Sequence, residues 1–473
     1  MLSQQRRCKE ERDRSRIRTT MTGSRVVWVA ARVVLLAGLA WFYADAAAEH
    51  ARVQNVARGR ADQSGYLWDA VAIHRNWQGQ QPPDLIGERN RMPLYPGFLA
   101  LFYDPSLSPD EFFEVGKRWN IRLSLVLLAL LWAIFAWHLP PLVSTNLTLI
   151  VAFGYFIFKA GYAQAELLFY FLVFVTFLTF CYLLEHRARA ASLGLGILAG
   201  LLAALAHLTK AALLPLVTIF LVVYGVRELI CLMRSDPAAR VAWRAAAGVA
   251  LVVCFLGVLY PYISNSKRVF GRYFYNVNTT FYVWYESWPE ASWGTYRHGD
   301  GLGWPKMPPE QIPSMEKYWR THTVRQILAR VGDGLAEMVT VSYRFFWYMK
   351  FVVLYVVLTL ALMATRWRPF RQMIRDNAAV AAFMLLYAVV YLVAIAFYRP
   401  ISGTTARMLL AHVTPLLFVL SCLFARSPFA EAQWRIGGVT LTPAHFHLLV
   451  FATMGLDLVF ALQPRLMGSF TGV

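Results

Sequence analysis

The chain carries little charge and few cysteines, and each shortage excludes a class of protein. Charged residues make up 15% of its 473 residues and hydrophobic residues 58%, whereas soluble domains contain about 25% charged residues. This balance excludes an ordinary soluble domain. The five cysteines comprise one near the N-terminus and four in apolar segments: Cys8, Cys181, Cys231, Cys254 and Cys422. We therefore expect neither a disulfide framework nor a metal site built from thiolates.

Motifs for nucleotides and nucleic acids are missing as well. The sequence contains no P-loop and no G-x-G-x-x-G after a strand, so it offers no glycine-rich cradle for a nucleotide. Its net charge of +19 could favour binding to a nucleic acid, but the basic residues form short clusters between hydrophobic segments. That distribution is typical of cytoplasmic membrane loops, and no nucleic-acid recognition motif accompanies it. We expect a lipid bilayer as partner and no nucleic acid.

Hydrophobic runs are what the chain has in abundance. A run of about 20 apolar residues can cross a hydrocarbon core of about 30 Å as a helix. We predict eleven spans: Val26–Ala46, Leu123–Trp137, Leu142–Phe158, Ala163–Leu184, Ser192–Leu208, Ala211–Leu232, Ala245–Tyr262, Phe345–Ala364, Ala378–Phe397, Ala406–Ala425 and Phe446–Leu462. The predicted fold class is an all-α polytopic membrane protein, with a basic cytoplasmic tail over residues 1–25 and a single transmembrane domain over 26–473.

Basic clusters give the expected orientation of these spans. The positive-inside rule places the Arg6-Arg7-Cys8-Lys9 tail in the cytoplasm, and alternation of the spans then puts the later basic clusters on the same side. Two long loops fall outside, at about 49–122 and 263–344. In the first, Ser108-Pro109-Asp110-Glu111 is a capping-box pattern that predicts a short helix at the membrane surface. We expect a multi-pass protein of a bacterial inner membrane with a cytoplasmic N-terminus.

Polar side chains, most of them ionisable, gather on the predicted outer side of the membrane. Such groups are costly near a bilayer and are usually functional, although Lys and Arg at helix ends also anchor a span by snorkelling. The shared sidedness of the set favours function. Its members are Asp62, Asp69, Glu88, Arg89, Arg91, Lys159, Gln164, Glu166, His207, Lys210, Arg399, Arg407 and His412.

Short patterns within this set resemble one known family. They are Asp62-x-x-x-Tyr66-x-x-x-Ala70, Arg91-x-Pro93-x-Tyr95-Pro96, Gln164-Ala-Glu166-Leu, Leu208-Thr209-Lys210 with Pro215, and Arg407-Met-Leu-Leu-Ala-His-Val-Thr-Pro415. In this order they are similar to the GT-C superfamily of integral-membrane glycosyltransferases, with protein mannosyltransferases and aminoarabinose transferases nearest in pattern. Two positions depart from the family, since Gln63 stands where Glu is frequent and Met408 where Tyr is common.

The resemblance implies a GT-C-like bundle and a reaction: inverting transfer of a sugar from a polyprenyl-phosphate donor to an extracytoplasmic glycan, lipid or protein. An acceptor hydroxyl needs a base; Asp62 is the first candidate and Asp69 the alternative. Cations would stabilise the departing phosphate. The expected substrate-binding residues are Tyr66, Asp69, Arg91, Tyr95, Lys159, Glu166, Lys210 and Arg407. A divalent metal ion held by Asp62 and Glu166 is left open.

Two other functions suit a protein of this kind. A polysaccharide ligase or polymerase would also use a lipid-linked sugar at a one-sided site. A transporter or flippase for lipid-linked sugars would place charges at mid-membrane and break its helices in matched halves. Because the charges of this chain gather at one face, we favour an enzyme, a membrane hexosyl- or pentosyltransferase.

Overall fold

Helices form nearly all the regular structure of the described residues. The computed structural model describes residues 23–59, 62–80, 91–185, 191–234, 238–297, 307–345, 349–402, 406–425 and 429–467. Residues 1–22 of the predicted tail lie outside these ranges, as do Glu88 and Arg89.

The longer helices follow the hydrophobic runs. They are α2 Gly23–Gln54, α5 Pro109–His138, α6 Pro141–Val151, α8 Glu166–Glu185, α9 Ala191–Thr209, α10 Leu214–Met233, α11 Ala238–Phe270, α15 Val324–Phe345, α16 Met349–Thr365, α18 Ala378–Ser402, α19 Ala406–Ala425 and α20 Pro443–Phe460. Shorter helices connect them: α3 Gln63–Trp77, α4 Leu94–Ala100, η3 Ala152–Phe156, α7 Ile157–Ala160, η4 Ala211–Leu213, α12 Val277–Thr280, η5 Tyr282–Trp284, α13 Trp288–Arg297, η6 Pro309–Gln311, α14 Met315–Thr321, α17 Trp367–Asp376 and α21 Leu462–Met467.

Nine helical segments in the described ranges are long and apolar enough to cross a membrane. They correspond to the second to seventh and the ninth to eleventh predicted spans. α16 passes the same test only together with α17, which bends away by 102°, and this pair takes the place of the eighth span. The first predicted span lies in α2, which is not among these segments. The all-α multi-pass fold is confirmed, and the count of eleven stays a prediction.

One helix corrects the prediction for the first long loop. The capping box is present, because Ser108 Oγ accepts from the Glu111 N–H and the Glu111 side chain accepts from the Ser108 N–H. However, the helix that it starts is α5, which continues for 30 residues to His138. The expected surface helix and the second span are thus one element. Amphipathic and apolar stretches joined without a breaker give no local signal for a boundary.

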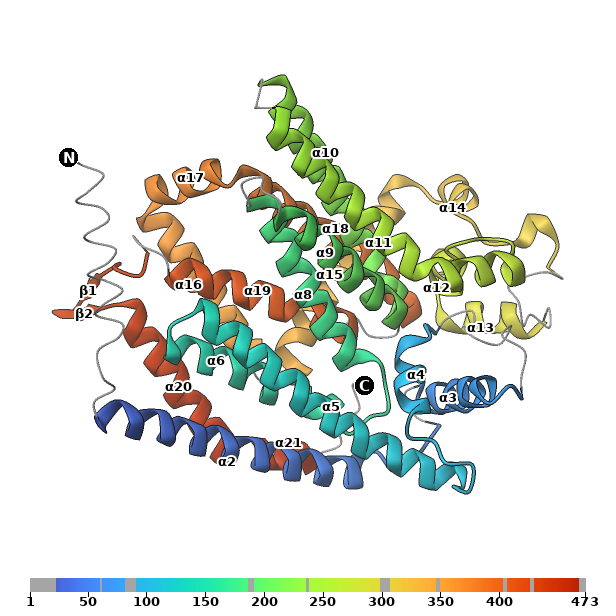
Figure 1. The fold of residues 1–473 in the computed structure, drawn as a ribbon, viewed down its shortest axis with the longest axis horizontal. Helices are drawn as coiled ribbons and strands as arrows, with labels where there is room; N and C mark the ends of the chain where they lie inside the picture. Colours follow the sequence, from blue (N-terminus) through green and yellow to red (C-terminus); the bar gives the residue numbers. More distant parts are fainter. Residues whose placement is uncertain are drawn as a thin grey trace.

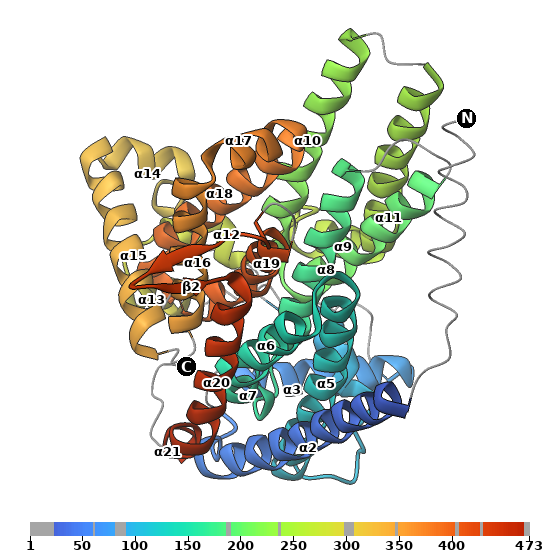
Figure 2. The same ribbon diagram turned by 90° about the vertical axis from the view of Figure 1, so that its left-hand side faces the viewer.

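The spans form a bundle with α8 near its middle (Figures 1 and 2). α8 is apolar around its whole circumference and packs against α9, α19 and α5, as expected of a helix enclosed by others. α9 and α11 approach closely at two glycines. A Cβ atom at Gly196 or Gly200 would lie 2.3 or 2.4 Å from the carbonyl oxygen of Ala247 or Leu251. Small residues permit this backbone approach between membrane helices.

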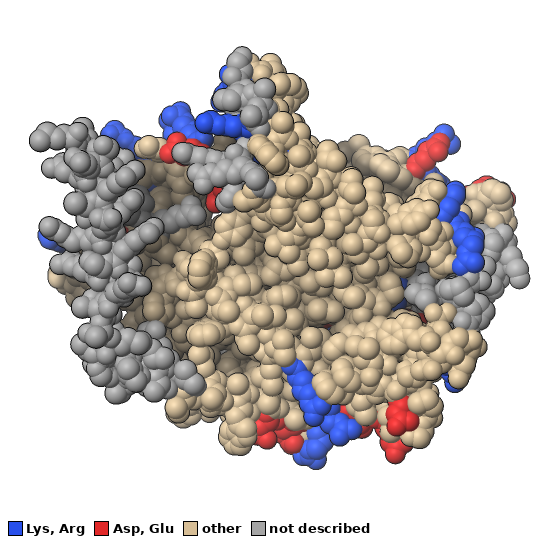
Figure 3. Space-filling model, viewed as in Figure 1, with Lys and Arg blue, Asp and Glu red and all other residues tan. Residues whose placement is uncertain are grey.

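One end of the bundle carries the helices of both long connections. α3, α4, α12, α13 and α14 lie together at the right of Figure 1, and we call this side the loop end. On the face seen in Figure 3, charged side chains lie at the margins around a broad uncharged area. This is the surface distribution expected of a protein that crosses a bilayer.

A small hairpin interrupts the helical pattern near the C-terminus. Strands β1 Trp434–Ile436 and β2 Val439–Leu441 pair antiparallel. The turn consists of Gly437 and Gly438, whose φ angles are 55° and 83°. Two-residue hairpin turns with positive φ at both positions favour glycine, so the Gly-Gly pair was a local signal for this hairpin.

Candidate active site

α3 and α4 form a platform beside the spans at the loop end. The two helices pack through Tyr66, Leu67, Tyr95 and Leu99, which are buried together with Ala163. The buried residues of α3 recur at three- and four-residue spacing, so one face of the helix points into the protein. The platform holds the start of α3 next to the turn that leads into α8.

Asp62 stands at the start of α3 in a strained conformation. Its φ of 66° makes it the one described residue other than glycine with a positive φ, which costs an L-residue about 1 kcal/mol. Its carboxylate does not cap α3. Instead, Asp62 Oδ2 accepts a hydrogen bond of 3.1 Å from Arg407 Nη1, and the Asp62 side chain stays 53% exposed. Backbone strain of this kind concentrates at functional sites.

Glu166 forms a second carboxylate–cation pair, deeper in the protein. Its Oε1 accepts a hydrogen bond of 2.7 Å from Lys210 Nζ, and only 3% of the Glu166 side chain is exposed. Its Oε2 is buried without a hydrogen-bond partner among the described residues. Glu166 also interacts electrostatically with Arg407 and Lys159. Because Arg407 contacts Asp62 as well, both pairs belong to one cluster.

Helix termini explain part of this arrangement. Glu166 lies in the first turn of α8, where the helix dipole favours a carboxylate. Lys210 directly follows α9, and a helix C-terminus favours a cation. Arg407 differs, because it lies in the first turn of α19, where the dipole opposes a positive charge. Asp62 and Glu166 offset this conflict, and a locally unfavourable placement is typical of functional positions.

Lys159 reaches the cluster from an irregular span. α6 passes into the π-helix η3 before α7 begins, and π segments are frequent at functional sites. Lys159 is buried and interacts electrostatically with Glu166, Arg407 and Lys210. Asn120 fixes its main chain, since Asn120 Nδ2 donates to the Lys159 carbonyl oxygen at 3.2 Å.

Tyr95 and Tyr66 support this region from the platform. Tyr95 is fully enclosed, and its hydroxyl donates to Asn120 Oδ1 at 2.9 Å, so it braces the residue that fixes Lys159. The Tyr66 ring meets Tyr95 edge-on at 5.4 Å between centroids. Burial raises the pKa of the Tyr66 hydroxyl far above its ordinary value, and Glu166 adds to the effect. The phenol therefore stays neutral.

Arg91 covers the first turn of α3. A Cβ atom added at Gly65 would lie 2.0 Å from Arg91 Cζ, so the guanidinium occupies the space that a side chain would need. It also lies 5.7 Å from the centre of the Tyr66 ring. Asp69 is on the same helix, nearly two turns beyond Asp62, and is half-buried. Asp62, the first of the two candidate bases, contacts Arg407.

Gln63, one of the two departures from the GT-C pattern, joins three elements. Asn55 Nδ2 donates to Gln63 Oε1 at 2.8 Å, and Gln63 Nε2 donates to Asn55 Oδ1 at 2.7 Å. The same Oε1 accepts from the Ala163 N–H at 2.9 Å. Both amide side chains are fully buried. The pair links the end of α2, the start of α3 and the turn before α8, and so fixes the position of Asp62. Sequence reasoning missed this role of Asn55 and Gln63.

A glutamate at position 63 should therefore weaken the fold. Gln63→Glu replaces the amide donor to Asn55 Oδ1 by an oxygen and introduces a buried charge, so we expect the free energy of unfolding to fall by about 1–3 kcal/mol or more. Thermal unfolding of the purified protein measures the change. The control is Gln80→Glu, at an exposed position after α3. Equal stability of the two variants would contradict the role given to the amide pair.

The cluster does not fit a divalent metal ion. Asp62 and Glu166, the two predicted ligands, each contact a cation already, and Lys159 lies in electrostatic range of Glu166. These positive charges would repel a further cation. Within the described ranges, no group of three or more His, Cys, Asp or Glu side chains could hold a metal. We assign the cluster no metal-dependent step.

Of the predicted site residues, the structure joins Asp62, Glu166, Lys159, Lys210 and Arg407 in one cluster and places Tyr66, Tyr95 and Arg91 around it. Sequence reasoning missed Asn55 and Asn120, which hold the cluster through buried amides. The interpretation rests on this geometry alone, since comparison with protein-family models, curated proteins and solved structures found no match.

Proposed function

We propose that the chain transfers a sugar from a polyprenyl-phosphate donor to an acceptor outside the cytoplasm, with inversion at the reacting carbon. The observation that carries the proposal is the cluster at the loop end, where two carboxylates lie among several cations. An acceptor hydroxyl needs a base, and a departing phosphate needs fixed positive charge. The cluster offers both in one place.

The charge of the cluster suits a phosphate. Arg407, Lys210 and Lys159 oppose only two carboxylates, which leaves an excess of positive charge. α3, α8 and α19 all begin there, and helix N-termini favour anions. Arg matches the geometry of phosphate oxygens, whereas Lys acts as a point charge. The isoprenoid chain of the donor would lie between spans in the apolar part of the bundle.

Donor binding would also release the base. In the structure Arg407 Nη1 donates a hydrogen bond to Asp62 Oδ2, so this carboxylate is already engaged. A donor phosphate would compete for the same guanidinium and leave Asp62 to accept the proton of the acceptor hydroxyl. The acceptor oxygen then bonds to the sugar carbon as the bond from that carbon to the phosphate oxygen breaks. This sequence predicts that the donor binds before the acceptor.

Glu166 is assigned a positioning role. Its contact with Lys210 and its electrostatic interactions with Lys159 and Arg407 hold the cations together. Without this carboxylate, three like charges would repel one another in a poorly hydrated site. Glu166 thereby keeps the phosphate-binding groups in place without itself reacting.

The one-sided position of the cluster also bears on the rival functions. A transporter would be expected to carry its charges near the middle of the bundle, but these groups lie where α7, α8, α9 and α19 end or begin. A ligase or polymerase would use the same base and phosphate site with a larger donor. Transfer of a single sugar remains our proposal, and the loop end would then face away from the cytoplasm.

Product analysis tests the function. The purified protein in lipid vesicles is given undecaprenyl-phosphate-linked sugars and an extract of cell-envelope glycans. We expect release of undecaprenyl phosphate together with a glycan that has gained one sugar of inverted configuration. Movement of intact donor across the bilayer without phosphate release would instead identify a flippase, and transfer of an oligosaccharide only would identify a ligase.

A further inference from the structure

A second polar site lies at the loop end, apart from the cluster of Asp62 and Glu166. It is a cavity of about 530 Å³, which we call the α15 pocket; its lining includes Glu286, Gln326, Arg330, Asp333 and Arg399. These residues come from the segment between η5 and α13, the first half of α15 and the end of α18. The volume lies within the range of small-molecule sites.

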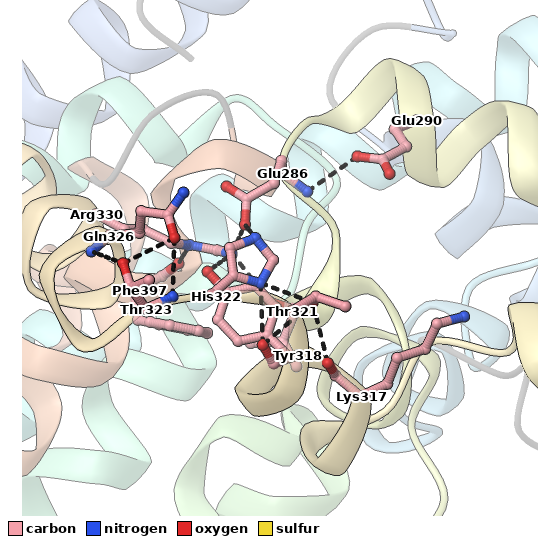
Figure 4. Close-up of polar contacts among 11 residues, drawn as sticks. Glu286, Glu290, Lys317, Tyr318, Thr321, His322, Thr323, Gln326, Arg330 and Phe397 are labelled. Carbon is pink, nitrogen blue, oxygen red and sulfur yellow. Dashed lines mark hydrogen bonds and ion pairs between the residues drawn. The ribbon is translucent and has the colours of Figure 1, made fainter.

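Arg330 forms a rigid wall of the pocket (Figure 4). Its side chain is only 5% exposed. Nη1 donates to Glu286 Oε1 at 3.1 Å and to the Tyr318 hydroxyl at 3.0 Å, and Nε donates to the Phe397 carbonyl oxygen at 2.8 Å. The guanidinium also lies 4.1 Å from the centre of the Phe397 ring. These contacts join α14, α15 and α18, so the pocket is pre-organised.

Glu286 is held from two sides. Besides the contact with Arg330, its Oε1 lies 3.2 Å from His322 Nε2, and the His322 ring stacks on Tyr318 at 4.0 Å between centroids (Figure 4). The Glu286 side chain is nevertheless 49% exposed. Part of its carboxylate therefore remains open to a ligand in a fixed position.

Two further lining groups have unused hydrogen-bonding capacity. Asp333 is exposed and makes no hydrogen bond or ion pair with the described part of the chain. Gln326 uses its Oε1 for the N–H and hydroxyl of Thr323 at 2.8 and 2.9 Å, which leaves its Nε2 donor. The pocket therefore offers carboxylate acceptors and an amide donor to one ligand.

This chemistry selects the ligand class. Both lining guanidiniums already contact a carboxylate, Arg330 that of Glu286 and Arg399 that of Glu337. A phosphate would meet carboxylates and guanidiniums that are already engaged, whereas an apolar chain would desolvate charged groups at a high cost. Sugar hydroxyls both donate and accept hydrogen bonds, so they match carboxylate and amide groups together.

The end of α18 connects the pocket to the candidate active site. Arg399 and Pro400 line the pocket, and the preceding residue, Tyr398, interacts electrostatically with Arg407 and Asp62. The end of α18 thus contributes to both sites. We propose that the α15 pocket binds the hydroxyl-rich part of the acceptor, which makes the acceptor a glycan; its role as acceptor rests on the proposed function, whereas glycan binding does not.

Glycoside binding tests the pocket directly. A panel of methyl glycosides is titrated against the full-length protein in detergent, with saturation-transfer NMR as readout. We expect binding of at least one glycoside, and we expect Asp333→Ala to weaken it about tenfold or more, because a charge-assisted hydrogen bond contributes about 1.5–3 kcal/mol. Glu286→Gln, which keeps an oxygen for Arg330, should also weaken it. The control is Glu310→Ala, at an exposed carboxylate outside the pocket.

The outcomes separate the two proposals. Binding that both pocket variants weaken and the control leaves unchanged supports the glycan site, even if the protein cleaves no lipid-linked donor and the proposed function fails. No glycoside binding by the wild-type protein, or equal binding by all variants, overturns the glycan site even if donor cleavage is found. With an active donor, a raised acceptor KM in Asp333→Ala supports the acceptor role, and an unchanged acceptor KM overturns it.

Discussion

Asp62→Asn should abolish sugar transfer while leaving the fold intact. Removal of a general base lowers a rate by about 10²- to 10⁴-fold, so we expect kcat to fall within that range. Asn adopts the left-handed conformation more readily than most residues, so the φ of 66° at position 62 adds no new strain. The lost ion pair with Arg407 is partly exposed, and such pairs contribute at most about 1 kcal/mol. Release of polyprenyl phosphate at matched protein levels measures the effect.

A glycine at the same position separates strain from chemistry. Asp62→Gly relieves the cost of the positive φ, about 1 kcal/mol, and removes the carboxylate. We expect this variant to be as stable as the wild type or more stable, and inactive. Activity near the wild-type level in either Asp62 variant would transfer the role of base to another group, with Asp69 next to be tested.

Arg407→Gln should impair use of the donor far more than use of the acceptor. Loss of one fixed donor to a developing anion costs about 10²- to 10³-fold in rate, and we expect kcat/KM for the lipid-linked sugar to fall by that factor. Arg407→Lys keeps the charge without the planar fork and should recover only part of the loss. Initial rates at varied donor and acceptor concentrations separate the two substrates.

The control for this variant is Arg325→Gln. Arg325 is an exposed residue in the first turn of α15 and forms no ion pair with the described residues. Arg325→Gln removes the same net charge at the loop end, so a general electrostatic effect would appear in both variants. A similar loss in both variants, or an unchanged kcat/KM for the donor in Arg407→Gln, would rule out a specific phosphate contact at Arg407.

Much of the fold could be predicted because its signals are local. Long apolar runs locate ten of the eleven expected spans, counting the bent α16–α17 pair, and the capping box marks the start of α5. The set of residues expected on the outer side also includes Asp62, Glu166, Lys210 and Arg407, and in the structure they form one cluster. The predicted spans and the residues of the cluster therefore follow from the periodicity of hydrophobicity and charge.

The internal contacts of the site could not be predicted in the same way. Asp62 and Arg407 are 345 residues apart in the chain, so nothing near either residue indicates the pairing. In the sequence Gln63 is only a departure from a family pattern, whereas in the structure its amide is a buried partner of Asn55 and Ala163. Neutral amides carry no charge, so the expected sidedness of charged residues does not locate them. Their partners depend on how the helices pack.

The π-helix η3 sets the direction in which the end of its span faces. Each residue of an α-helix advances the chain by about 100°, and a π turn accommodates one extra residue. Everything after Phe156 is therefore rotated by about 100° relative to an uninterrupted α-helix from Pro141. Lys159 points at the cluster because of this added residue. The direction of its side chain therefore depends on the number of residues in the span as well as on their type. Deletion of one residue between Ala152 and Phe156 would leave the hydrophobicity unchanged and turn the ammonium group away from Glu166.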